Sequence, residues 1–288
     1  MKTIRDAKFV AEWINMEPMV PEPRIDWIDK KYLDIAYGDD PLQKFDLYMP
    51  DDDKPVPLVI LVHGGGWCCC DKRDWHLYPG FYALKKGFAL ASINYRLAPA
   101  VQFPKPLEDV KSAINYIRDH ASELGVRKED IFLYGTSAGG NLVALAGLQN
   151  AGSKNAVSGV AALCPLIDFE NQCKYWEIYH DIASEYVTLS RSQLRDYLGE
   201  ESYKEAGTKK HITKEAPPFY IQHGTLDPAV PFIQSYNLAN QLREVCGKEQ
   251  VVFDILDNTG HAGGGPEFLE KEHIIPIFDF FLKYCTNK

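Results

Sequence analysis

One serine of the sequence stands in a setting that suits a nucleophile. Residues Gly135–Gly140 read Gly-Thr-Ser-Ala-Gly-Gly, follow the short apolar run Ile131–Tyr134 and precede the apolar segment Asn141–Gln149. A Gly-x-Ser-x-Gly turn between a strand and a helix exposes the serine hydroxyl beside the helix N-terminus, whose free N–H groups favour developing negative charge. The pattern predicts that Ser137 attacks an electrophilic carbon. A glycine-rich turn without chemistry is the alternative.

A second glycine-rich segment could stabilise the anion that such an attack creates. Residues His63–Trp67 read His-Gly-Gly-Gly-Trp and directly follow the apolar run Pro57–Val62. Consecutive glycines let backbone N–H groups point into a site without obstruction by side chains, so the loop can donate hydrogen bonds to an oxyanion. A phosphate-binding loop is the alternative, but the segment lacks the Lys and Ser/Thr of a P-loop. We expect His63 to hold the loop by hydrogen bonding rather than to transfer a proton.

The serine needs a proton acceptor, and the sequence offers eight histidines. His261 follows the last strand-like run, Val251–Leu256, and precedes the last helix-like segment. Where the nucleophile lies on a strand–turn–helix motif, the base comes last along the chain. We therefore predict that His261 is the base, and that His223, at the end of another strand, has a structural role.

The base in turn needs a carboxylate to orient it. Asp227 comes after the strand-like run Phe219–Gln222, on a loop expected at the carboxyl edge of a parallel sheet and next to the last strand. Its rival, Asp257, lies on the same loop as His261 and would have to fold back to reach the imidazole. We predict the chain order Ser137, Asp227, His261, which is the α/β-hydrolase order and not that of chymotrypsin or subtilisin.

Alternating strand-like and helix-like segments must position these residues. Continuous apolar runs suit strands buried on both faces, and the apolar spacing within Glu108–His120 suits a helix. The pattern predicts an α/β fold with a mainly parallel central sheet of about eight strands flanked by helices. The expected strands are Tyr32–Tyr37 and Lys44–Tyr48 (an antiparallel pair), Pro57–Val62, Phe88–Ile93, Ile131–Tyr134, Val157–Leu163, Phe219–Gln222 and Val251–Leu256, and the other helices are Asn141–Gln149, Phe232–Val245 and Glu267–Tyr284.

Two stretches, residues 1–30 and 168–214, break this alternation. The second is rich in Tyr among charges and is too long for a plain crossover between two strands. It is either a surface excursion with its own small core or a helical cap over a pocket, and we favour the cap. Because the chain shows no repeat and no low-complexity linker, we expect a single α/β-hydrolase domain over 1–288, with 1–30 and 168–214 as cap elements.

The charge and hydrophobicity of the sequence limit the kinds of partner that we expect the protein to bind. Thirty-one basic against forty acidic residues give a formal net charge of −9 over 288 residues, and no block of five or more Lys or Arg occurs. A nucleic-acid-binding protein would need a basic face, and a polyanionic substrate would meet net repulsion, so we expect a neutral small molecule. No apolar run approaches the ~18 residues that a membrane span requires. We expect neither nucleic acid nor membrane as a partner.

The sequence contains seven cysteines, and three of them are consecutive. No Cys-x-x-Cys pair matches a zinc site, so we expect reduced thiols, no metal and no cofactor. The start of the chain is charged, and Glu12 interrupts what could be the apolar core of a signal peptide, so we expect a cytoplasmic protein. Cys68–Cys70 directly follow the glycine loop, so at least one of them is expected on the pocket wall. Trp67 and Cys68 are our candidate substrate-binding residues. The alternative is that the thiols merely fill space beside the loop.

Taken together, these motifs make the chain similar to the hormone-sensitive-lipase-like branch of the α/β-hydrolases, and especially to small bacterial acetyl esterases. The resemblance covers residues ~35 to ~285 in the expected order, and implies that the backbone N–H groups of Gly65, Gly66 and Ala138 form the oxyanion hole. Two departures are visible: many relatives have an acidic residue in place of Thr136, and usually Asp in place of Asn94. The motifs are His63–Trp67, Asn94–Pro99, Phe103-Pro104, Asp109, Gly135–Gly140, Asp227-Pro228 and Gly260-His261.

The resemblance and the triad predict a serine carboxylesterase acting on short acyl esters, acetyl to butyryl, of carbohydrate or aryl alcohols. An amidase, formamidase or peptidase on the same fold is the first alternative. A non-catalytic ligand-binding relative is the second, but such proteins lose a triad member, whereas all three candidates are present here. The expected partner is a small ester, and the sequence leaves open whether the chain forms a homodimer.

Overall fold

A computed structural model describes residues 23–179, 184–199, 204–261 and 266–286 of the chain. Within them, eight strands form one sheet in the order β1-β2-β4-β3-β5-β6-β7-β8. The first two strands pair antiparallel to each other, β2 pairs antiparallel to β4, and the other pairs are parallel. The strands are β1 (Lys31–Ala36), β2 (Lys44–Tyr48), β3 (Val56–Val62), β4 (Ala89–Ile93), β5 (Val126–Thr136), β6 (Gly159–Leu163), β7 (Phe219–Gly224) and β8 (Val251–Leu256).

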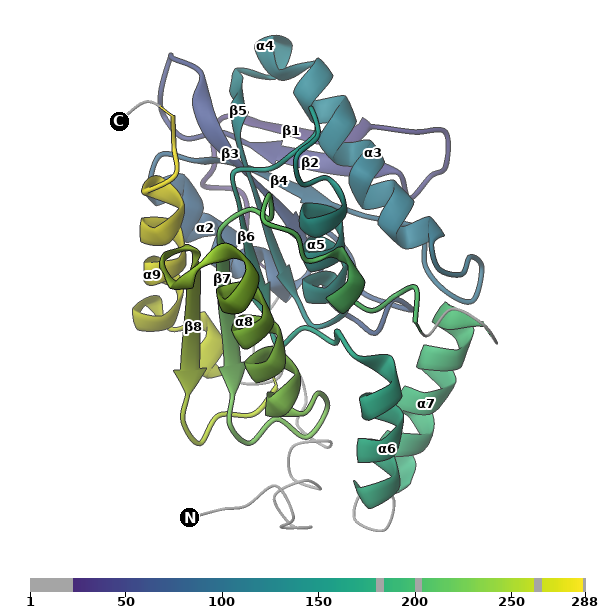
Figure 1. The fold of residues 1–288 in the computed structure, drawn as a ribbon. Coiled ribbons are helices and arrows are strands. Elements are labelled where there is room, and N and C mark those ends of the chain that lie inside the picture. The colour runs from purple at the N-terminus through teal and green to yellow at the C-terminus, as the bar shows by residue number, and fades with distance from the viewer. Residues whose placement is uncertain (1–22, 180–183, 200–203, 262–265, 287–288) are drawn as a thin grey trace.

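Helices cover both faces of this sheet (Figure 1). Alternate residues of β3 enter two different cores: Leu58 and Ile60 pack in the core beneath α3, α5 and α8, whereas Val59 packs with Phe81 of α2 and Phe278 of α9. The helices are α2 (Tyr78–Lys85), α3 (Lys105–Asp119), α4 (Ala121–Leu124), α5 (Ala138–Gln149), α6 (Phe169–Tyr179), α7 (Ser184–Leu198), α8 (Phe232–Cys246) and α9 (Lys271–Leu282). Burial on both faces explains why the central strands are continuous apolar runs.

The predicted fold class is confirmed, and each predicted strand contributes to the sheet. The differences lie at element boundaries and in α2 and the short α4, neither of which the sequence pattern predicted. The strand expected at Ile131–Tyr134 begins earlier, at Val126, and the last helix begins later, at Lys271, after a short 3-10 turn at Pro266–Leu269. The α2 segment carries Pro79 and Gly80, which weaken a helical pattern.

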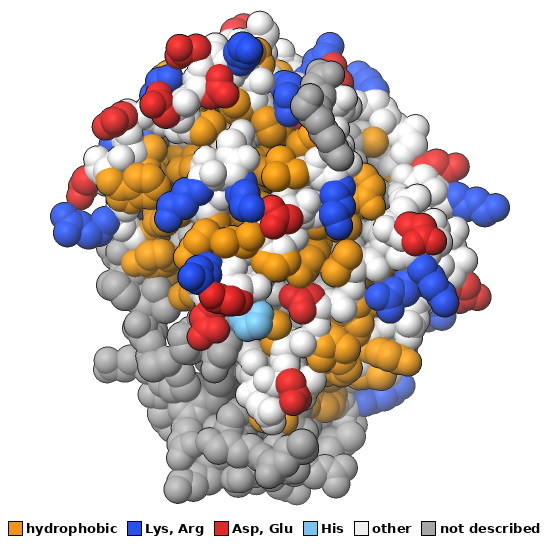
Figure 2. All heavy atoms as spheres, turned by 90° about the vertical axis from the view of Figure 1, so that its left-hand side faces the viewer, with side chains coloured by type: hydrophobic (Ala, Val, Ile, Leu, Met, Phe, Trp, Pro, Cys, Tyr) orange, Lys and Arg blue, Asp and Glu red, His pale blue; other side chains and the backbone are white. Residues whose placement is uncertain are grey.

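The segment 168–214 contains the helical pair α6 and α7, which stands at the carboxyl end of the parallel strands (Figure 1). Most of the other expected cap element, residues 1–22, lies outside the described residues. Figure 2 shows the side of the molecule beside β8 and α9, where acidic and basic side chains are interspersed with apolar ones. Of the helices that the structure describes, none combines the length and the apolar character needed to cross a bilayer.

Candidate active site

Four of the parallel strands bring the predicted site residues to one edge of the sheet. The glycine loop follows β3, Ser137 follows β5, Asp227 follows β7 and His261 follows β8. Because parallel strands end at the same edge, residues distant in sequence converge there, as is usual for sites on open α/β sheets.

Ser137 occupies the strained turn that its motif predicts. Its backbone angles are φ 56° and ψ −116°, and its N–H donates to the carbonyl oxygen of Leu163 on β6 at 2.8 Å. A side chain at Gly139 would overlap the carbonyl oxygens of Val62 and His63, so only glycine lets α5 begin this close to the end of β3. The turn therefore holds the serine hydroxyl beside the glycine loop.

An unbroken hydrogen-bonded relay joins the three triad candidates. His261 Nε2 lies 2.8 Å from Ser137 Oγ, and His261 Nδ1 lies 2.6 Å from Asp227 Oδ2. Asp227 is fully buried and His261 is 8% exposed. In this arrangement Nδ1–H donates to the carboxylate, which leaves Nε2 free to accept the serine proton. The structure thus brings together the serine, histidine and aspartate that the sequence singled out.

Asp227 keeps its charge despite complete burial. Burial raises the pKa of its carboxyl, but the neighbouring His261 and His223 outweigh that effect and hold the pKa well below the usual range of aspartate. The other oxygen, Oδ1, accepts the backbone N–H groups of Ala229 and Val230, both at 2.8 Å. A carboxylate with this many donors stays ionised, as the orienting member of a triad must.

His223 has a role that the sequence analysis did not define. Its Nε2 lies 3.0 Å from Asp227 Oδ2 and 3.0 Å from the carbonyl oxygen of Val230, and both are acceptors, so Nε2 carries the proton. Its Nδ1 lies 2.6 Å from Ser235 Oγ on α8. His223 thereby links the carboxylate of Asp227 to Ser235 of α8. Its only signal in the sequence was its place at the end of β7, four residues before Asp227.

Asp257, the alternative candidate for the acid, contacts Thr225 and Asn258. It is exposed, and its carboxylate accepts hydrogen bonds from Thr225 Oγ1 at 3.2 Å and Asn258 Nδ2 at 3.0 Å. These contacts hold the turn after β8, so of the two carboxylates it is Asp227 that contacts the imidazole of His261.

A histidine and a tyrosine, His63 and Tyr95, hold the glycine loop through its carbonyl oxygens. His63 Nδ1 donates to the carbonyl oxygen of Gly64 at 2.9 Å, and its ring stacks on Tyr95 with centroids 4.4 Å apart. The Tyr95 hydroxyl donates to the carbonyl oxygens of His63 and Gly64, at 3.0 and 3.2 Å. Burial, with the nearby His76, lowers the pKa of His63 to about 4, so His63 is neutral and serves the loop structure.

The residues beside Tyr95 brace the same region. Arg96 makes a bidentate ion pair with the buried Asp109 of α3, whose Oδ1 also accepts from Gln43 Nε2 at 2.7 Å. Asn94 Oδ1 accepts the backbone N–H of Lys72 at 2.7 Å, downstream of the glycine loop. These contacts give a physical reason for the Asn-Tyr-Arg segment and for Asp109 among the motif residues.

The predicted oxyanion donors belong to the glycine loop and to the residue that follows the serine. A methyl group at Gly64 would come within 3.4 Å of Ser137 Cβ, so the loop passes directly beside the nucleophile. Gly65 and Gly66 have positive φ, 93° and 58°, which turns the loop sharply there. Ala138 is the first residue of α5, where a backbone N–H has no intrahelical partner. We expect these three amides to bind the oxyanion.

The cap helix α7 lies over the loop on the side of Trp67. The Trp67 ring stacks on Tyr197 with centroids 4.2 Å apart and an interplanar angle of 2°, and it is only 4% exposed. Cys68 Sγ lies 3.9 Å from the backbone oxygen of Gln193, and a methyl group at Gly66 would come within 2.9 Å of Gln193 Oε1. Gln193 therefore stands next to the expected oxyanion hole, a position that no local pattern in the sequence indicated.

Two groups of cysteine, aspartate and histidine side chains in the described part of the chain lie close enough to hold a metal ion. One combines Cys164 with Asp227 and His261, whose polar atoms already make the relay. The other combines Cys70 with Asp74 and His76 and lies next to the glycine loop.

A family described as BD-FAE matches residues 45–242, about two thirds of the chain, including Ser137 and Asp227. The chain belongs to this family. Esterase LipC of Mycobacterium tuberculosis is 31% identical over 244 residues, covering 79% of this chain and 59% of LipC. The chain thus spans less than two thirds of the length of LipC.

Solved structures share the BD-FAE chain's fold. An arylesterase superposes with a TM-score of 0.77 at 21% identity, covering 96% of this chain and 90% of the arylesterase. A truncated carbohydrate esterase from gut microbiota superposes with a TM-score of 0.76 at 23% identity, covering 92% of this chain and 99% of that one. Both are α/β-hydrolase folds, which confirms the fold expected from the resemblance.

Proposed function

We propose that this chain is a serine carboxylesterase that hydrolyses short-chain acyl esters of carbohydrate or aryl alcohols. The observation that carries the proposal is the relay from Ser137 Oγ through His261 to the buried, ionised Asp227, set beside a loop of three glycines. Membership of the BD-FAE family and similarity to proteins named esterases support the choice of an ester.

Acylation follows from the relay. His261 Nε2 accepts the hydroxyl proton as Ser137 Oγ attacks the ester carbonyl, and Asp227 stabilises the imidazolium that forms. The carbonyl oxygen becomes an oxyanion between Gly65, Gly66 and Ala138, where one well-placed donor is typically worth ~3 kcal/mol. The imidazolium then protonates the leaving alcohol, and an acyl-serine remains.

Deacylation repeats the sequence with water in place of the serine. His261 takes a proton from water, the hydroxide attacks the acyl carbonyl, and the same amides bind the second oxyanion. Collapse of this intermediate returns the proton to Ser137 Oγ and releases the carboxylic acid.

The cap contacts favour short acyl groups. The stacked Trp67 and Tyr197, with Phe169 of α6 5.9 Å from the Trp67 ring, tie both cap helices to the loop beside the nucleophile. In an open groove each added methylene would gain ~0.8 kcal/mol by burial, so long chains would be preferred. A wall of packed rings next to the oxyanion loop reverses that trend by steric exclusion.

The test is kcat/KM for p-nitrophenyl esters of two to twelve carbons, measured below their micellar concentrations. We expect a maximum at two to four carbons and release of acetate from acetylated xylo-oligosaccharides. A maximum at eight carbons or beyond would contradict the short-acyl proposal. The Ser137→Ala variant, which removes one oxygen, is expected to lose hydrolysis while unfolding at the temperature of the parent protein.

Matched ester and amide substrates with the same acyl and leaving groups separate the esterase from an amidase. We expect the ester to be hydrolysed by far the faster of the two, and an equal or greater rate on the amide would favour the amidase. We further propose a reducing compartment such as the cytoplasm, because Cys68, Cys69, Cys70 and Cys246 carry thiols rather than disulfides.

A further inference from the structure

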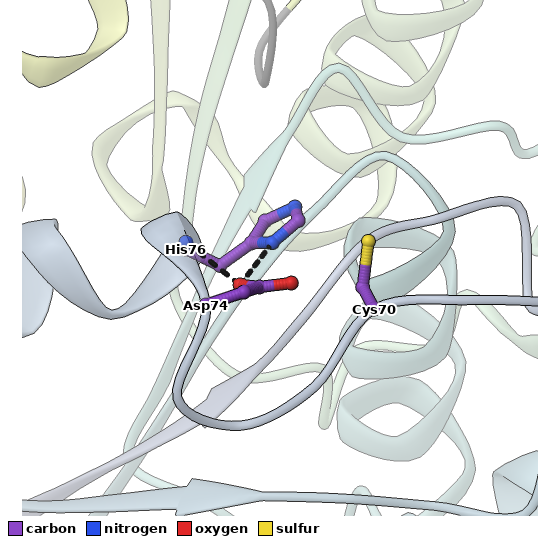
Figure 3. A group of neighbouring side chains, drawn as sticks. All are labelled: Cys70, Asp74 and His76. Carbon is purple, nitrogen blue, oxygen red and sulfur yellow. Dashed lines mark hydrogen bonds and ion pairs between the residues drawn. The ribbon is translucent and has the colours of Figure 1, made fainter. Parts of the chain in front are cut away.

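A thiol, a carboxylate and an imidazole face one another beneath the glycine loop (Figure 3). One ligand atom from each of Cys70, Asp74 and His76 lies within 4.8 Å of the others. His76 is buried, and Cys70 and Asp74 are half-buried. None of the three belongs to the relay of the candidate active site.

The carboxylate and imidazole of this cluster are already oriented. Asp74 Oδ1 accepts the His76 backbone N–H at 2.9 Å and lies 2.7 Å from His76 Nδ1. Asp74 Oδ2 accepts the backbone N–H of Asp71 at 3.1 Å. These bonds shape the turn into the 3-10 helix Trp75–Leu77, and a carboxylate oxygen retains a further lone pair for a ligand.

The thiols are not needed for that turn. Cys70 has φ 79°, a backbone conformation in which glycine or asparagine would cost less. Cys69 Sγ lies 3.9 Å from Cys70 Sγ. Two sulfur ligands of a tetrahedral zinc ion, each at about 2.3 Å from the metal, lie about 3.8 Å apart. The two sulfurs are therefore already spaced as one edge of a tetrahedral site.

We propose that Cys69, Cys70, Asp74 and His76 bind a zinc-class divalent cation behind the oxyanion loop. Two thiolates, one imidazole nitrogen and one carboxylate oxygen are a ligand set that suits tetrahedral Zn²⁺. Each thiol releases its proton to water as it coordinates. Drawing the ligand atoms of Cys70, Asp74 and His76 in to bonding distance takes a movement of about 1 Å. Cys69 Sγ, which lies 3.9 Å from Cys70 Sγ and is bonded to the carbonyl oxygen of Gly65, has to turn toward these three to become the fourth ligand.

A cation bound at this site alters the glycine loop next to it. The effect on catalysis rests on the proposed esterase activity. A side chain at Gly65 would overlap the backbone of Cys69 and come within 2.7 Å of Cys70 Sγ, so the thiols touch this loop residue directly. Cys69 Sγ also donates to the carbonyl oxygen of Gly65 at 3.2 Å, and coordination removes that bond. The cation thus displaces one expected oxyanion donor and lowers kcat.

The binding test uses Co²⁺ as a spectroscopic probe on the reduced, full-length protein. We expect one equivalent to produce a sulfur-to-cobalt charge-transfer band and the visible bands of tetrahedral Co²⁺, both displaced by Zn²⁺. Cys70→Ser and His76→Gln should each weaken binding at least about 10-fold. The matched control Cys246→Ser, whose thiol contacts Thr213 on another side of the fold, should bind as the parent does.

Three outcomes overturn the proposal. The first is no sulfur-to-cobalt band at one equivalent. The second is binding that survives both Cys70→Ser and His76→Gln in variants whose circular dichroism shows a native fold. The third is binding that Cys164→Ala abolishes, because the ion would then lie at the triad. These readouts need no activity, so failure of the proposed esterase function leaves them interpretable.

The coupling to the loop is tested by activity. Saturating Zn²⁺ should lower kcat at least about threefold, with KM little changed, because an oxyanion donor acts mainly in the transition state. The Cys70→Ser variant should resist this inhibition, whereas Cys246→Ser should not. An unchanged kcat at full occupancy would overturn the coupling.

Discussion

At the scale of single residues, Asp227 is the most densely contacted group of the site. Two imidazoles and two backbone N–H groups converge on one buried carboxylate. Such a group gains its ionisation from donors that surround it, since water is excluded. The orientation of His261 therefore depends on a charge that the protein interior itself stabilises.

Replacing this carboxylate should remove most of the catalysis. Asp227→Asn puts an amide where His261 Nδ1–H donates, so the imidazole turns to the wrong tautomer, and kcat should fall on the order of 10⁴-fold. The measurement is kcat on p-nitrophenyl acetate. Asp257→Asn is the matched control and should be mild, because Asp257 is exposed and accepts from Thr225 and Asn258 rather than from His261. The reverse result would refute our assignment of the acid.

His63 makes folding stability depend on pH. Burial, with the nearby His76, lowers its folded pKa to about 4, whereas an unfolded histidine titrates near ~6.5. Unfolding therefore takes up a proton between these values. The stabilisation is complete above about pH 6.5 and is lost as the pH falls toward 4, by at most about 3 kcal/mol.

This dependence can be measured by urea unfolding between pH 4.5 and 7.5. The His63→Asn variant should show a shallower loss of unfolding free energy on acidification than the parent protein. Identical slopes for the parent and His63→Asn would contradict the buried, neutral state of His63.

At the scale of elements, the glycine loop owes its shape to Tyr95. That hydroxyl bonds two consecutive carbonyl oxygens of the loop. We expect Tyr95→Phe to leave two buried acceptors without this donor, to cost about 1–3 kcal/mol of stability and to lower kcat about 10-fold. Thermal unfolding and kcat measure both effects. The control is Tyr284→Phe, whose exposed hydroxyl donates to the carbonyl oxygen of Glu249, and it should change neither the stability nor kcat. A parent-like kcat in Tyr95→Phe would show that the loop does not need this hydroxyl.

The sequence predicted the elements whose signal is local. Apolar runs such as Pro57–Val62 become buried strands because both sheet faces are covered, and Gly135–Gly140 forms its turn because β5 and α5 meet there. Gln193 was not predictable, because its relation to Gly66 is set by how α7 packs on the loop and not by any spacing. The role of His223 also needed three dimensions, since α8 supplies its partner Ser235.

At the scale of the whole molecule, the net charge of −9 should shape substrate preference. An ester that carries a carboxylate on its alcohol meets repulsion that a neutral ester of the same size does not. We expect its kcat/KM to be several-fold lower at low ionic strength, and the gap to shrink as added salt screens the charge. Rates for the paired esters from 10 mM to 0.5 M NaCl test this. A gap that salt leaves unchanged would place the discrimination in local contacts instead.

The position of β8 at the edge of the sheet means that ester hydrolysis can be used to follow the folding of this strand. Within the described sheet β8 is an edge strand paired only with β7, and the loop that follows it carries His261. Ser137 and Asp227 can be in place while β8 is still undocked, but the relay then has no base. Recovery of activity during refolding therefore reports the arrival of this edge strand. Probes of the central strands report the rest of the sheet, so a lag between the two signals would measure how much later β8 docks.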